Sequence, residues 1–267
     1  MILVTFIYFL LGVVTGIFSG LLGIGGGIIV VPTLAYIFYR DHMPAVFVMH
    51  IAIGTSLAIM MLTTLRSLWS HLAHPGRDEF LGIAKSLIPT VIIGVVLGGV
   101  LADFLHPNLL KIIFGMVVLL IALRLFFVPD KEDVSKHLPS TGWMRLAGFV
   151  MGTASGLLGI GGGTTVIPYL LYYQTAMRIA VRVSIVLGFI IAIIGATTYY
   201  ISGIHAALPP HCWGYIYWPA WLGVSVGSVL FAPVGAELSY HLSSHILRRV
   251  FALLMLFISI HMLYFSI

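Results

Sequence analysis

Long apolar segments separated by short polar stretches make up almost the whole of this chain. Four lie in the first half, at about residues 2–39, 44–70, 81–104 and 107–128. Four more lie in the second half, at about 142–173, 179–203, 213–238 and 243–266. Because about 20 apolar residues in a helix cross a bilayer core of about 30 Å, we expect these segments to be embedded in a membrane. The pattern predicts an all-α integral membrane protein.

The two halves repeat one motif. SGLLGIGGGIIVVP at Ser19–Pro32 returns as SGLLGIGGGTTVIP at Ser155–Pro168, with eleven of fourteen positions identical and an offset of 136 (155 minus 19). The polar stretch 128–142 is the one linker-like region of the chain. We therefore divide the chain into a first transmembrane repeat at 1–128, a cytoplasmic linker at 129–141 and a second transmembrane repeat at 142–267.

The first segment of each half is too long for one crossing. A straight helix over residues 2–39 would be about 57 Å long at 1.5 Å per residue, and a glycine cluster, which disfavours helix, lies at its middle. We infer a hairpin that returns to the side it came from. Such a hairpin directs eleven of the thirteen Lys and Arg residues towards one side and leaves only Arg40 and Lys111 on the other. That asymmetry is what the positive-inside rule predicts.

Each half then consists of a glycine-broken helical hairpin and three transmembrane helices. Because the number of crossings per half is odd, the two halves are predicted to be inverted repeats, with both chain ends outside and the linker in the cytoplasm. Inverted repeats with broken helices are typical of secondary transporters, whose site lies near the midplane where the breaks meet.

The glycine breaks have the chemistry of an anion site. The second arm of each hairpin begins with backbone N–H groups that lack helical partners, and a helix N-terminus carries partial positive charge. Nearby hydroxyls would add neutral donors. Close helix packing is the alternative role for the glycines. The candidate substrate-binding residues are Ser19, Gly23, Gly25, Gly26, Gly27, Thr55, Ser56, Ser155, Gly159, Gly161, Gly162, Gly163, Thr164, Thr165, Arg182 and Ser184.

These residues resemble a known family. The paired GLLGIGGG motifs with a following proline, the GTSL element at 54–57 and the eight apolar segments resemble the TauE/SafE family of sulfite and organosulfonate exporters. The resemblance covers almost the full length. It implies a prokaryotic, multi-pass inner-membrane permease for sulfite or a related inorganic or organic sulfur anion. The second half departs from the pattern, because Arg182 and Val183 stand where Gly54 and Thr55 stand in the first half.

The sequence allows two interpretations of the role of several polar residues. Arg182 either binds the anion or lies near the cytoplasmic surface as a topology charge. Asp103 and Glu237 either carry protons or are solvated or paired at an interface, and His50 either titrates or is a packed histidine. The single cysteine, Cys212, allows no internal disulfide and is expected to be a packed thiol.

Other function classes have less support in the sequence. The net charge of +5 is attributed to topology signals rather than to nucleic acid, and no histidine spacing suggests a metal. No HExxH or paired-carboxylate arrangement supports an enzyme, and no cofactor is predicted. A passive anion channel and an uptake carrier for another small anion stay open. The sequence makes no prediction of oligomeric state.

Overall fold

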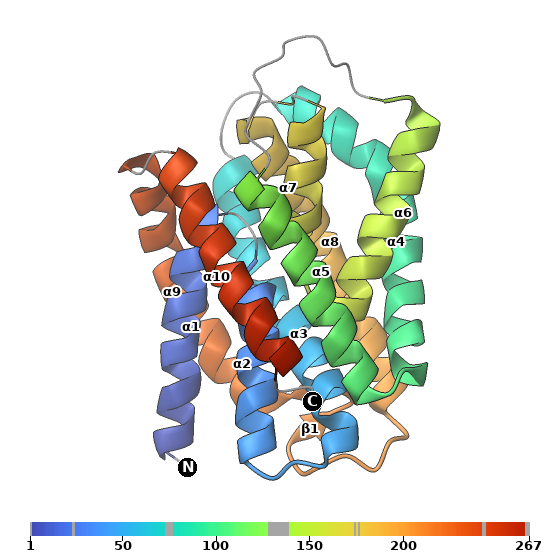
Figure 1. The fold of residues 1–267 in the computed structure, drawn as a ribbon, viewed down its shortest axis with the longest axis vertical. Helices are drawn as coiled ribbons and strands as arrows, with labels where there is room; N and C mark the ends of the chain where they lie inside the picture. The colour runs from blue at the N-terminus through green and yellow to red at the C-terminus, as the bar shows by residue number, and fades with distance from the viewer. Residues whose placement is uncertain are drawn as a thin grey trace.

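The computed structural model describes residues 2–22, 25–72, 77–127, 139–173, 175, 177–241 and 244–264. These ranges form a bundle of helices with one two-stranded antiparallel sheet (Figure 1). The helices of the first half are α1 (Ile2–Leu22), α2 (Gly27–Arg40), α3 (Ala45–Leu72), α4 (Arg77–Phe104) and α5 (Pro107–Phe127). Those of the second half are α6 (Thr141–Leu158), α7 (Gly162–Tyr172), α8 (Met177–Gly203), α9 (Trp218–His241) and α10 (Ser244–Tyr264), with β1 (Cys212–Trp213) and β2 (Ile216–Tyr217) between α8 and α9.

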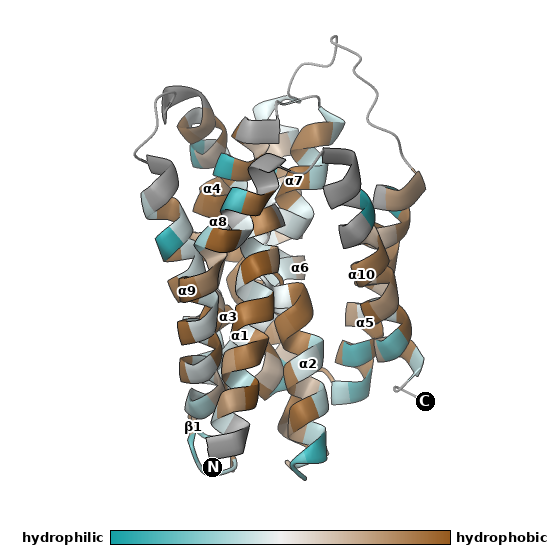
Figure 2. Ribbon diagram, turned by 90° about the vertical axis from the view of Figure 1, so that its left-hand side faces the viewer, coloured by the Kyte–Doolittle hydropathy of each residue, from teal (hydrophilic) through white to brown (hydrophobic). Residues whose placement is uncertain are grey.

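The outer surface of the bundle is apolar. Helices α3, α4, α5, α8 and α9 each contain a stretch long and apolar enough to cross a bilayer. Large apolar side chains in mid-helix point outwards, as Ile93, Leu120 and Leu230 do with exposed fractions of 60, 64 and 60%. Figure 2 shows this hydrophobic colouring along the helices, with polar residues mainly near their ends. The prediction of an all-α integral membrane protein is confirmed.

Both long first segments are broken at their glycine clusters, as predicted. The first is divided into α1 and α2, and the second into α6 and α7. In Figure 1 the arm α2 returns to the lower end of the bundle, where α1 begins, whereas α7 leads to the upper end. This arrangement supports the predicted inversion of the halves, which itself stays a prediction, as do the domain boundaries.

The halves interlock through a reciprocal exchange of helices. Helix α1 packs most extensively on α9, and its counterpart α6 packs on α4. Helix α3 packs on α8, and α5 on α10. The most extensive helix contacts thus join one half to the other, whereas α2 packs on α3 and α7 on α8 within each half.

Glycines on the helix faces allow the two exchanged pairs to approach closely. A Cβ atom on Gly152 of α6 would lie 2.9 Å from Val91 Cα of α4, and one on Gly12 of α1 would lie 2.9 Å from Gly227 Cα of α9. Real Cβ atoms do not come so near to backbone, so a larger residue would force the helices apart. These are small-residue interfaces of the kind that holds membrane helices together.

The seventh predicted segment begins too early. The apolar run 213–238 was expected to be one membrane segment, but α9 starts at Trp218. Residues 212–217 instead form the β1–β2 hairpin, whose turn contains Gly214 at φ 53°. We call residues 204–217 the cap, because they lie at the lower end of the bundle in Figure 1.

Candidate functional site at the two glycine breaks

The break between α1 and α2 is formed by glycines in a left-handed conformation. Gly25 and Gly26 both have a backbone φ of 74°, which residues other than glycine rarely adopt. The Gly26 carbonyl accepts the N–H groups of Ile29 and Val30 at 3.0 and 3.1 Å and so begins α2. Gly23, another candidate, lies outside the described residues. We call residues 25–27 the first tip.

The break between α6 and α7 has a different geometry. Gly159 ends α6 at φ 66°, and its N–H donates to the Ser155 carbonyl at 2.9 Å. Gly161, which corresponds to Gly25 by the offset of 136, is extended at φ −70°. Helix α7 then begins at Gly162. We call residues 159–163 the second tip. The near-identical sequences therefore form two unlike turns.

The structure brings the two tips into contact. A Cβ atom on Gly27 would collide with the Gly159 carbonyl oxygen and would lie 3.3 Å from Ile160 Cα. Met60 of α3 borders the same point, with its Sδ 2.8 Å from that Cβ position. The N-terminus of α2 thus lies against the backbone that leads into α7.

The GTS element of α3 holds the surroundings of the tips in place. Gly54 leaves room for the Tyr215 backbone of the cap. The Thr55 hydroxyl oxygen accepts the Tyr217 N–H at 2.9 Å, and the Ser56 hydroxyl donates to the Gly159 carbonyl at 3.1 Å. Both side chains are completely buried. Thr55 therefore holds the cap and Ser56 holds the second tip.

Helix α8 supports the second tip from another side. A Cβ atom on Gly162 would lie 3.0 Å from both the Gly188 nitrogen and the Ser184 carbonyl oxygen. The Thr64 methyl of α3 comes within 3.6 Å of the Cβ position at Gly25 and within 3.7 Å of that at Gly188. Thr64 and Gly188 were not predicted as site residues, since each is one small residue in an apolar helix with no motif to mark it.

Three of the candidate hydroxyls donate hydrogen bonds within their own helices. Thr164 donates to Gly161 at 2.8 Å, Thr165 to Gly162 at 3.5 Å and Ser184 to Val181 at 2.8 Å. Ser155 differs, because its completely buried hydroxyl has no hydrogen-bond partner among the described residues. Ser19, its counterpart in the first half, is buried with its Cβ 3.9 Å from the Cβ position of Gly26.

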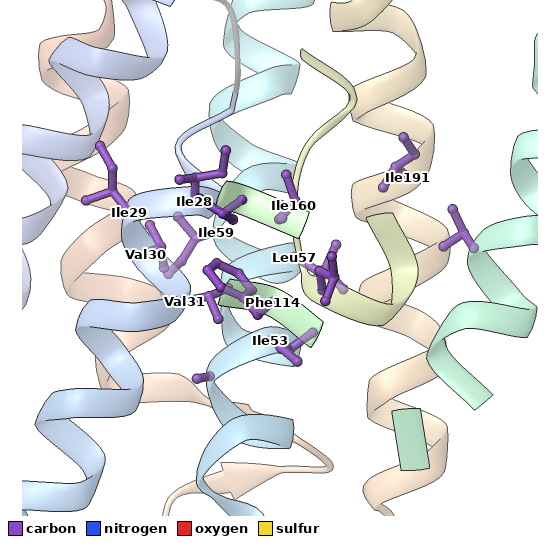
Figure 3. Close-up of a cluster of buried hydrophobic side chains, with 14 of the residues drawn as sticks. Ile28, Ile29, Val30, Val31, Ile53, Leu57, Ile59, Phe114, Ile160 and Ile191 are labelled. Atoms are coloured by element: carbon purple, nitrogen blue, oxygen red, sulfur yellow. The ribbon is translucent and has the colours of Figure 1, made fainter. Parts of the chain in front are cut away.

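Apolar side chains enclose the tips. Figure 3 shows Ile28 of α2, Ile53 and Ile59 of α3, and Ile160 of the second tip in one cluster. Each is at most 1% exposed. Gly25–Gly27 and Gly159–Gly163 are buried as well. The conformation is therefore closed around the tips.

Arg182 lies beside the start of α4. Its guanidinium is 5.7 Å from the centre of the Phe80 ring, within the range of a cation–π contact. It is partly buried, two residues before Ser184, which borders Gly162. Anion binding by Arg182 and its alternative role as a topology charge both stay predictions.

The other polar candidates lie away from the tips. Asp103 and Glu237 are exposed, and Asp103 accepts a hydrogen bond from the Tyr215 hydroxyl at 2.9 Å. His50 is buried between α3 and α4. Cys212 is half-buried in the cap, where burial raises the pKa of its thiol to about 11. Within the described ranges, no three His, Cys, Asp or Glu residues are grouped closely enough to hold a metal ion.

Known proteins resemble this chain over nearly its whole length. The family model described as "Sulfite exporter TauE/SafE" matches residues 8–262. A probable membrane transporter protein of Haemophilus influenzae is 29% identical over 254 residues, which is 95% of this chain and 96% of that protein. Others from Methanocaldococcus jannaschii and Bacillus subtilis are 26 and 24% identical, over 84 and 95% of this chain and 80 and 95% of their own lengths. No solved structure is significantly similar. The family and the relatives' names indicate a membrane transporter.

Proposed function

Because this chain belongs to the sulfite exporter TauE/SafE family, we propose that it exports a small sulfur-containing anion, such as sulfite or an organosulfonate, by alternating access. The chain is a multi-pass inner-membrane transporter. In the proposal, the anion binds at the two tips, which the rocking of the two halves exposes first to one side and then to the other.

The contact between the tips is the observation that carries this proposal. Gly27, at the start of α2, meets Gly159 and Ile160, just before the start of α7. Two helix N-termini thus lie near one another inside the bundle. Each contributes about half a positive charge from its dipole, so together they would stabilise about one negative charge.

The surroundings of the tips favour a ligand that binds through hydrogen bonds. In an apolar interior, backbone donors need an acceptor, at a cost of several kcal/mol when none is present. The buried Ser155 hydroxyl lies one turn before Gly159 and is free to donate to the same ligand. Glycine at the tips lets an oxyanion approach the backbone without meeting side chains.

Labelled sulfite counterflow in proteoliposomes tests the proposal, with sulfate, chloride and taurine as competitors. We expect saturable counterflow that sulfur oxyanions or sulfonates inhibit. Gly26→Leu and Gly162→Leu should each impair it, because the new side chains block approach to the backbone. Gly82→Leu is the matched control, since nothing lies within 4 Å of the Cβ position at Gly82.

The possible outcomes separate the alternatives. Flux without counterflow would indicate a passive channel. Saturable counterflow of another anion, but not of sulfite, would indicate that the carrier has a different substrate. Normal flux in both leucine variants, in demonstrably folded protein, would contradict binding at the tips.

A further inference from the structure

His50 lies in a closed ring of contacts that joins α3, α4 and the cap. It is 4% exposed. Its Nε2 is 2.9 Å from the Ala102 carbonyl oxygen of α4, and its Nδ1 is 3.2 Å from the Val46 carbonyl oxygen of α3. Its ring centre is 5.3 Å from that of Tyr215 in the cap. The Tyr215 hydroxyl donates to Asp103, the residue after Ala102, at 2.9 Å and so closes the ring.

The two carbonyl oxygens make the protonation state of His50 important. A carbonyl oxygen only accepts hydrogen bonds, whereas a neutral imidazole donates from one nitrogen and accepts at the other. A neutral His50 would therefore face one carbonyl with a lone pair. The imidazolium donates to both carbonyls, and its charge is also attracted to the Tyr215 ring.

Tyr215 keeps its role in the ring over the physiological pH range. Burial, followed by its hydrogen bond to Asp103, raises the pKa of the Tyr215 hydroxyl. The hydroxyl therefore stays protonated and remains the donor to the carboxylate. Any change in the ring near neutral pH must come from another member.

We propose that His50 is a proton-binding site, and that its proton holds the cap closed over the lower end of the bundle. With the proton bound, His50 joins Val46, Ala102 and Tyr215. When the proton leaves, His50 loses one hydrogen bond and the charged contact with Tyr215, so the cap opens more readily. Closure is favoured in acid and weakens as the pH rises. The proposal is independent of which anion is carried.

Titration of the other groups around His50 would not weaken closure of the cap as the pH rises. Those joined to it through the ring of contacts are Asp103 from α4, Tyr215 from the cap and Tyr199 from α8, whose ring centre is 6.3 Å from that of Tyr215. Lys111 of α5 lies instead over the Tyr39 ring of α2, 5.6 Å from its centre. Protonation of Asp103 would weaken its acceptor and so loosen the cap in acid, which is the opposite sign.

Hydrogen–deuterium exchange of the cap amides tests the proposal on the full chain in detergent micelles, from pH 5 to 8. The reporters are Tyr215 and Tyr217, whose N–H groups donate to the Tyr199 carbonyl and the Thr55 hydroxyl oxygen at 3.2 and 2.9 Å. Protection is expressed relative to the intrinsic exchange rate at each pH. We expect it to fall about tenfold as the pH rises, the effect of losing one charge-assisted hydrogen bond.

Three variants locate the group that titrates. In His50→Gln, protection at pH 5 should already equal the pH 8 level of the unchanged protein. In His205→Gln, which alters an exposed cap histidine, and in Asp103→Asn, which keeps an oxygen acceptor, protection should still fall as the pH rises. Flat protection in the unchanged protein overturns the proposal whether or not His50→Gln folds. A fall retained in His50→Gln, or lost in His205→Gln, overturns it too.

Discussion

The Ser56 hydroxyl of α3 donates a hydrogen bond to the Gly159 carbonyl of the second tip at 3.1 Å, across 103 residues of sequence. The neighbouring Thr55 accepts the Tyr217 N–H of the cap. Two adjacent residues of one helix thus connect the cap with the tip. A displacement of α3 would move both.

Ser56→Ala should lower stability by about 1 kcal/mol, because the buried Gly159 carbonyl loses its donor. It should also reduce sulfite counterflow, since the second tip is no longer held to α3. Thermal unfolding in detergent and counterflow measure the two effects. Ser86→Ala is the control, because that hydroxyl donates to Ile83 in its own helix. Equal effects of the two substitutions would contradict a specific role for Ser56.

Ser155→Ala should raise stability slightly yet impair transport. A buried hydroxyl without a partner costs about 1–3 kcal/mol, and alanine removes that cost. If the hydroxyl serves the anion, the substitution raises the KM for counterflow. Ser225→Ala is matched, since that hydroxyl is also buried and without a partner among the described residues but belongs to α9. An unchanged KM in Ser155→Ala would remove this residue from the site.

Gly152→Ala should destabilise the protein by about 1–3 kcal/mol through overpacking. The added methyl group meets the Val91 backbone of α4, with Val91 Cα only 2.9 Å away. Gly142→Ala near the start of the same helix has open space around it and should change stability by less than about 1 kcal/mol. Thermal unfolding of both variants compares them. If both unfold like the unchanged protein, the α4–α6 interface tolerates separation.

Cys212 should react slowly with maleimide. With the thiol pKa raised to about 11, its thiolate fraction at pH 7.5 is roughly 300-fold below that of a free cysteine with a pKa of about 8.5. A more basic thiolate is a better nucleophile, which raises the rate constant of the thiolate about tenfold. We therefore expect labelling to be about 30-fold slower overall. The rate should still rise between pH 8 and 10, and denaturation should restore fast labelling. Fast labelling of the folded protein would show that the thiol is solvated.

The breaks of the first segments were predictable because helix length and glycine content are local properties. The unlike geometry of the two tips was not, since Gly25 and Gly161 occupy equivalent places in nearly the same motif. The two tips also have different neighbours: Thr15 and Ser19 lie beside Gly26, whereas Ser184 and Gly188 lie beside Gly162. No periodicity in the sequence reveals such contacts.

The cap and the GTS element show the same limit. Cys212–Tyr217 is as apolar and aromatic as the helix that follows, so the run was extended too far. Thr55 and Ser56 were predicted as site residues from the sequence, but their hydrogen-bond partners Tyr217 and Gly159 are distant in sequence. Their role towards the anion stays a prediction.

The reciprocal packing of α1 on α9 has a consequence for biosynthesis. Helix α1 is translated first, but its partner follows only after most of the chain has been made. At roughly 5–20 residues per second, this delay lasts on the order of ten to forty seconds. During that time the glycine face of α1 is in the membrane without its partner. Lipid or an insertion factor must cover that face until the last quarter of the chain arrives, so the nascent protein depends on its host membrane before it can transport anything.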